Sequence, residues 1–182
     1  RWNGCVGVWR GVRRSRGEGR NSVVEGPEMP ASTGNIGRTG VSTDTRLHRI
    51  EPLGFKLNEK AIRRAGRDYW PKLDVTVYSD YQEFLERNPG AKIYMATTKA
   101  KQVYTDVSYE PDCFLMFGPE SRGIPEEILL ENQETCVRIP MWGDIRSLNL
   151  SNSVAIVLYE ALRQNGFENM KLQGQLTKYQ WK

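Results

Sequence analysis

The sequence has few of the residues that build metal sites and disulfide frameworks. His48 is its only histidine, and Cys5, Cys113 and Cys136 lie far apart with no C-x-x-C pair. Three scattered cysteines predict neither a disulfide framework nor a zinc site. A single imidazole excludes a histidine-rich metal centre and leaves little for acid–base catalysis. We therefore expect a protein of a reducing compartment that needs no metal.

Long apolar runs are also missing. No stretch approaches the roughly 18 consecutive apolar residues that a membrane-spanning helix needs, and the mean hydropathy is −0.60. A length of 182 residues, with 38% hydrophobic and 26% charged residues, is ordinary for one globular domain. We expect a soluble, cytoplasmic protein that does not contact a membrane.

Positive charge is concentrated at the N-terminal end. Residues 1–20 contain six arginines and one glutamate, a net charge of +5, whereas the rest carries 20 basic and 21 acidic residues, a net charge of −1. The pI of about 9.0 therefore says little about the body of the protein. Residues 1–22 are rich in Gly and Arg and lack hydrophobic periodicity, so we expect a disordered leader. A cloning or mistranslation remnant, an organelle transit segment and an RNA-contacting arm are all consistent with this composition.

From Val23 onward the pattern alternates between strands and helices, which predicts an α/β domain over residues 23–170 and a tail over 171–182. Strands are expected at residues 23–24, 47–50, 75–78, 92–97, 113–117 and 137–139. Helices are expected from Ser32, over 58–65, over 81–87 after a capping Asp80, and over 151–164. The last helix has an apolar face and a stop at Asn165-Gly166. We expect an open sheet with helices on both faces.

Three loops each follow a predicted strand, where ligands bind in open α/β sheets. The first, residues 33–38, contains Gly34 and Gly37, which permit close approach of a backbone. Arg38, about a turn into the expected helix, can aim a planar guanidinium at a phosphate or a sugar hydroxyl. The alternative is an ordinary glycine-rich helix start with a surface arginine.

The second loop, residues 117–127, again combines an apolar strand end with glycines, Gly118 and Gly123. Pro125 suits the start of a helix, and Glu126 and Glu127 complement the helix dipole. Those acids disfavour a phosphate there and favour a flat, neutral group such as a nucleoside. A tight strand-to-helix connection without a ligand is the alternative.

The third loop, within residues 139–153, places small polar side chains before the strongly apolar last helix. Ser151 or Asn152 is expected to cap that helix, which explains part of the cluster. Capping by either residue does not explain Ser147 and Asn149.

Together the three loops, in this order and with a helix after the last, resemble the three sequence motifs of the SpoU branch of the SPOUT methyltransferases. Within that branch the chain resembles the small tRNA (cytidine/uridine-2'-O)-methyltransferases that modify the wobble nucleotide. The resemblance covers residues 23–167 and includes LHRIEPLGF at 47–55, RRAGRDYW at 63–70 and TTK at 97–99.

The resemblance implies a function and an assembly. The implied reaction moves a methyl group from S-adenosylmethionine to a ribose 2'-hydroxyl of tRNA, gives S-adenosylhomocysteine and needs no metal. The implied fold has a deep C-terminal trefoil knot, which no periodicity can reveal, in a homodimer whose active site is completed across the interface. Arg38 matches the catalytic arginine, and because a guanidinium holds its proton firmly we expect it to position the ribose. The implied cofactor contacts are Ala96, Gly118, Ile139, Ser147, Leu148 and Asn149.

A basic surface is the expected site for tRNA. Lysine and arginine track phosphates, while aromatic side chains stack on unpaired bases. The alternative is a solvated helix face with Trp70 in the core. The residues concerned are Lys60, Arg63, Arg64, Arg67 and Lys72, with Tyr69 and Trp70 between them.

The first motif departs from the family pattern. Ser32 stands where asparagine usually precedes Thr-Gly-Asn, and Gly26 interrupts the usual Tyr-Glu-Pro-Glu segment. A noncatalytic RNA-binding relative is therefore the alternative function. A Rossmann-type nucleotide enzyme is disfavoured, because no G-x-G-x-x-G follows a first strand.

Overall fold

A seven-stranded sheet forms the centre of the molecule, in the strand order β4-β3-β1-β2-β6-β5-β7. The computed structural model describes residues 7–8, 21–25, 30–51 and 70–182. The strands are β1 (Gly7–Val8), β2 (Asn21–Glu25), β3 (Arg46–Ile50), β4 (Val75–Tyr78), β5 (Ile93–Ala96), β6 (Phe114–Phe117) and β7 (Cys136–Val137). The predicted strands are thus confirmed, with small shifts of their ends.

All the strand pairs are parallel except those of β1, which runs antiparallel to both β2 and β3. Strand β2 lies near the middle of the sheet and pairs with β6 through Val23 and Met116. It begins upstream of the expected remnant at residues 23–24, so the central strand is present. Gly7–Val8 of the expected leader form β1, and the prediction of disorder for the rest of residues 1–20 lies outside the described residues.

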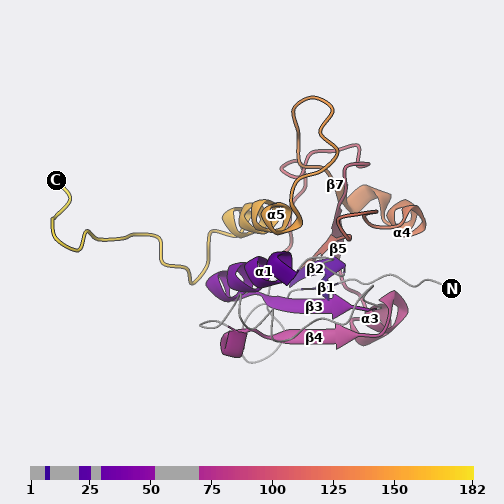
Figure 1. The fold of residues 1–182 in the computed structure, drawn as a ribbon, viewed down its shortest axis with the longest axis horizontal. Helices are drawn as coiled ribbons and strands as arrows, with labels where there is room; N and C mark the ends of the chain where they lie inside the picture. The colour runs from indigo at the N-terminus through magenta and orange to yellow at the C-terminus, as the bar shows by residue number, and fades with distance from the viewer. Residues whose placement is uncertain (1–6, 9–20, 26–29, 52–69) are drawn as a thin grey trace.

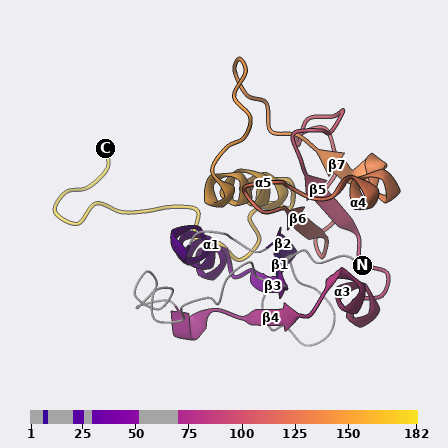
Figure 2. The ribbon, with the colours of Figure 1, turned by 45° about the vertical axis from the view of Figure 1, so that its right-hand side comes forward.

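The sheet is covered on both faces, as the sequence predicts. Along β6 the buried side chains alternate, since Phe114 and Met116 belong to one hydrophobic cluster and Leu115 and Phe117 to the other. The first cluster packs against α3 (Tyr81–Arg87) and α4 (Glu126–Glu131), and the second against α1 (Pro30–Thr43) and α5 (Leu150–Gln164). Helices α1 and α5 lie side by side over their face in both ribbon views (Figures 1 and 2).

Two helices begin and end much as their sequences predict. Asp80 caps α3 by accepting a 2.8 Å hydrogen bond from the backbone N–H of Glu83. Helix α5 stops at Asn165, and Gly166 follows with a φ of +71° that suits glycine. The expected apolar face of α5 is confirmed as buried: Val154, Val157, Leu158, Ala161 and Leu162.

The helix expected from Ser32 is confirmed as α1, which begins two residues earlier, at Pro30. The first of the three predicted loops, residues 33–38, therefore lies within this helix. Proline at a first helical position is common because its missing N–H has no partner there in any helix. The helix predicted over residues 58–65 lies outside the described residues.

After α5 the chain leaves the body. Residues 171–182 form neither helix nor strand, and in Figures 1 and 2 this segment runs outward from the end of α5. Within the part of the chain that the structure describes, no helix is long and apolar enough to span a membrane.

Candidate functional site

A cavity of about 430 Å³ opens at the carboxyl ends of β5, β6 and β7. Ala96 ends β5 and Phe117 ends β6, and both line the cavity. These strands are adjacent in the sheet, so the loops that follow them converge at one edge. Ligands of open parallel sheets bind in this position, and the volume is ordinary for a small-molecule site.

The first wall is the short loop after β5. Thr97, Thr98 and Lys99 line the cavity, and the Thr97 N–H donates a 2.9 Å bond to the Val137 carbonyl. The Arg138 guanidinium also donates to the Thr98 carbonyl, so the loop after β5 is tied to the residue that follows β7. In the sequence only the resemblance to the family points to residues 97–99, although they follow a buried strand as the other loops do.

The second wall is the loop from Gly118 to Ile124. A Cβ on Gly118 would lie 2.2 Å from the backbone carbon of Gly123 and 2.2 Å from the nitrogen of Ile124, so only glycine fits. The turn closes through a 2.9 Å bond from the Gly123 N–H to the Pro119 carbonyl. The backbone at Gly118 therefore lies directly against the backbone of Gly123 and Ile124 in the same loop.

An ion pair links these two walls. The Lys99 ammonium donates a 2.7 Å hydrogen bond to Glu126, the first residue of α4. That bond holds the pKa of the Glu126 carboxylate below its usual value. Both side chains are exposed, so the pair contributes little to stability and leaves Lys99 able to turn toward a ligand.

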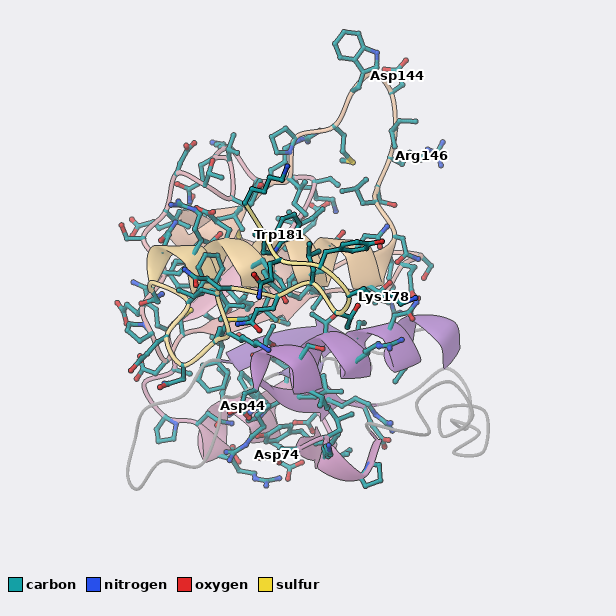
Figure 3. The ribbon with its side chains drawn as sticks, turned by 90° about the vertical axis from the view of Figure 1, so that its left-hand side faces the viewer. Asp44, Asp74, Asp144, Arg146, Lys178 and Trp181 are labelled. Carbon is teal, nitrogen blue, oxygen red and sulfur yellow. The ribbon has the colours of Figure 1, made fainter. Side chains whose placement is uncertain are left out.

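The third wall is the long connection between β7 and α5. Ile139, Met141, Ser147 and Leu148 line the cavity together with Arg146. In Figure 3 the part of this loop that carries Asp144 and Arg146 projects from the body. It offers the cavity both apolar surface and a cation.

Asn149 caps helix α5, which corrects the expectation of a cap at Ser151 or Asn152. Its Oδ1 accepts hydrogen bonds from the backbone N–H of Ser151 at 3.0 Å and of Asn152 at 3.4 Å. The Ser151 hydroxyl donates to the same oxygen at 2.5 Å, and the Ser153 hydroxyl donates to the Asn149 carbonyl at 3.2 Å. Capping thus explains most of the small polar cluster, and Ser147 is left for the cavity.

The structure brings together most of the expected cofactor contacts. All of them line the cavity except Asn149, which holds the start of α5 beside it: Ala96, Gly118, Ile139, Ser147 and Leu148. Leu150 and Ser153 in the first turn of α5 also line it and were not expected. The sequence gives no sign of this role, because small polar and apolar residues in a first helical turn are equally explained by capping and packing.

Arg38 is placed apart from this group. It lies on an exposed side of α1, and it is not among the described residues that line the cavity. The neighbouring Ser32 and Thr33 are buried, so the altered first motif packs into the body. The assignment of Arg38 to catalysis stays a prediction.

Little of the expected basic surface can be placed. Arg63, Arg64 and Arg67 lie outside the described residues, as does Lys60. Lys72 is exposed in the short 3-10 helix η1 (Trp70–Lys72).

The chemistry of the cavity is that of binding and orientation. The cavity is lined by apolar side chains, hydroxyl groups, basic side chains and the carboxylate of Glu120. No histidine or cysteine is among the described lining residues. Over residues 7–8, 21–25, 30–51 and 70–182, no three His, Cys, Asp or Glu side chains are grouped to hold a metal ion.

Known proteins are similar to this chain in sequence, and solved structures are similar to it in fold. The tRNA (cytidine(34)-2'-O)-methyltransferase of Escherichia coli K12 is 47% identical over 148 residues, which cover 81% of this chain and 94% of that protein. A solved structure described as "Structural insights into the 2-OH methylation of C/U34 on tRNA" is 39% identical with a TM-score of 0.71, over 78% of this chain and 93% of the other.

A more distant structure shares the fold. The SpoU methyltransferase AviRb from Streptomyces viridochromogenes, solved in complex with AdoMet, has a TM-score of 0.65 at 22% identity, over 78% of this chain and 58% of that chain. The SpoU rRNA methylase family matches residues 20–159. Since that match spans most of the chain and includes every wall of the cavity, the chain belongs to the SpoU methylase family.

Proposed function

We propose that this protein transfers the methyl group of S-adenosylmethionine to the ribose 2'-hydroxyl of nucleotide 34 of a tRNA. The observation that carries the proposal is the cavity at the carboxyl ends of β5, β6 and β7, in a chain that is 47% identical over 148 residues to a tRNA (cytidine(34)-2'-O)-methyltransferase. The relative's name supplies the substrate, and the cavity supplies a site for the cofactor.

The lining residues fit S-adenosylmethionine. Ile139 and Leu148 offer apolar atoms to the faces of an adenine, and the Ser147 hydroxyl offers a hydrogen bond to its polar edge or to the ribose. Lys99 and Arg122 can pair with the carboxylate of the methionine part. When bound, the cofactor supplies an activated methyl group and leaves as S-adenosylhomocysteine.

Arg38 then acts on the RNA and not on the cofactor. A guanidinium group is a poor base, so Arg38 orients the ribose and the adjoining phosphate and does not remove the proton of the hydroxyl. Bringing the hydroxyl into line with the methyl group supplies most of the acceleration. Because Arg38 is exposed and outside the lining of its own cavity, it serves the cavity of a second copy in a homodimer.

Two further properties of the family complete the proposal. The chain between β6 and α5 forms a deep trefoil knot that surrounds the cofactor. The protein works in the cytoplasm, where tRNA and the cofactor are both present, and the reaction needs no metal.

The test is mass spectrometry of tRNA nucleosides after incubation with the protein and S-adenosylmethionine. We expect a 2'-O-methylated nucleoside at position 34, and none when the tRNA carries a 2'-deoxynucleotide at that position. Adding a chelator should leave the yield unchanged. Tight tRNA binding without any methylated nucleoside would instead show a noncatalytic relative.

A further inference from the structure

The C-terminal tail, residues 171–182, presents large apolar side chains to solvent. Leu172 is 70% exposed, Tyr179 78% and Trp181 72%. Aromatic side chains on an ordinary surface segment pack against the body, because burial of each ring is favourable. These rings do not, so the tail has the composition of a contact surface for another molecule.

The charged side chains of the same segment are all basic. Lys178 and Lys182 flank the two exposed rings, Lys171 begins the segment, and residues 171–182 contain no aspartate or glutamate. Figure 3 shows Lys178 and Trp181 on this extended stretch, which does not belong to a helix or a strand. Lysines that flank exposed aromatics are the combination with which proteins hold single-stranded nucleic acid.

The charge also distinguishes RNA from a second copy of the chain. Protein–protein interfaces are depleted of lysine, because desolvating an ammonium group is costly. A strand of RNA instead offers a phosphate for each lysine and a flat base for each ring.

The tail lies away from the cavity. Leu150 at the start of α5 lines the cavity, and the helix has 15 residues, so the chain leaves α5 about 22 Å farther on. In Figures 1 and 2 the tail runs outward from the end of α5 and does not turn back along the helix. In this arrangement it contacts parts of the RNA other than the reacting ribose.

We propose that residues 171–182 form an RNA-binding arm, in which Tyr179 and Trp181 stack on unpaired bases of the substrate RNA while the three lysines contact its phosphates. The arm rests on the proposed function for the identity of its RNA. It lies outside residues 20–159, which match the family.

The experiment compares the full-length protein with two variants. The first is Tyr179→Ala with Trp181→Ala, and the second replaces all three tail lysines by glutamine. The matched control, Gln173→Ala with Gln175→Ala, alters the same exposed segment and keeps its rings and charges. Affinity for a fluorescent anticodon stem-loop RNA is measured by anisotropy over a range of salt concentrations, and methylation is measured as kcat and KM.

We expect the aromatic variant to bind the RNA on the order of tenfold more weakly or worse, because each stacked base contributes substantially. The lysine variant should make the slope of log affinity against log salt shallower by about 2. In both variants KM should rise while kcat is retained, because the arm binds ground state and transition state alike. The control should match the unaltered protein.

An aromatic variant that binds the RNA within twofold of the unaltered protein overturns the proposal. So does a variant that dissociates to monomers in sedimentation while its affinity for RNA is kept, since the tail would then hold a second copy. If the tail variants methylate tRNA and bind RNA as the unaltered protein does, the proposed RNA-binding arm is wrong and the proposed reaction stands. If RNA binding depends on the tail but no methylation occurs, the proposed reaction is wrong and the arm stands.

Discussion

Gly118 shows how one residue without a side chain can shape a binding site. Its Cα lies so close to the backbone of Gly123 and Ile124 that an added methyl carbon would sit 2.2 Å from two backbone atoms. These are backbone atoms, which cannot change rotamer as a side chain can, so a side chain at position 118 would displace the whole turn. The turn is one wall of the cavity, and its position therefore depends on this glycine.

We predict that Gly118→Ala weakens S-adenosylmethionine binding about tenfold or more and destabilises the protein by about 1–3 kcal/mol, the usual cost of forcing atoms into a packed site. Calorimetric titration and thermal unfolding measure the two effects. Gly174→Ala is the control, because a methyl group there meets nothing within 4 Å. Unchanged cofactor affinity in Gly118→Ala would mean that the turn does not hold the cofactor.

At the scale of elements, the start of α5 joins folding to binding. Asn149 satisfies two backbone N–H groups of the first turn, and the same turn presents Leu150 and Ser153 to the cavity. If the first turn of α5 frays, Leu150 and Ser153 no longer hold fixed positions in the wall of the cavity. Asn149 therefore influences the cofactor through α5, although its own side-chain oxygen is occupied by the cap.

We predict that Asn149→Ala lowers the free energy of unfolding by about 1 kcal/mol, whereas Asn149→Ser and Asn149→Asp, which also cap, stay close to the unaltered protein. Chemical denaturation measures this difference, and cofactor affinity is measured on the same samples. If Asn149→Ser keeps its stability and still loses cofactor affinity severalfold, the amide contacts the cofactor directly.

The elements differ in how far their sequences reveal them. The face of α5 is visible because Val154, Leu158 and Ala161 recur with helical spacing, and the structure buries them. Helix α1 is harder to recognise, since Gly34, Gly37 and Gly40 have low helix propensity. All three glycines are buried, so packing against the body outweighs their low helix propensity.

At the scale of the whole molecule, the cavity depends on neighbours that are not consecutive in the chain. Strand β5 lies between β6 and β7, and this order cannot be read from hydrophobic patterning. The sequence therefore predicts the loops within residues 117–127 and 139–153 as parts of a site, but not that residues 97–99 complete it. Equally, nothing local in the sequence indicates that Arg38 lies outside the cavity of its own chain.

The placement of Arg38 leads to a prediction about the assembly. If the arginine of one copy serves the cavity of the other, two inactive variants can restore each other. Arg38→Ala removes the arginine, and Ser147→Tyr fills the cavity that Ser147 lines. After both proteins are denatured and refolded together in equal amounts, half the dimers are mixed, and each mixed dimer has one complete site. We expect about a quarter of the unaltered methylation rate, against almost none for either variant alone.

A second mixture provides the control for this experiment. The unaltered chain is refolded with a chain that carries both Arg38→Ala and Ser147→Tyr. If sites are shared between copies, a mixed dimer has no complete site, and only the unaltered homodimers, about a quarter of the total, remain active. If each chain holds its own complete site, the mixed dimers contribute as well and about half the rate is kept. That second result, together with no activity in the first mixture, would place Arg38 in the active site of its own chain and refute the shared site.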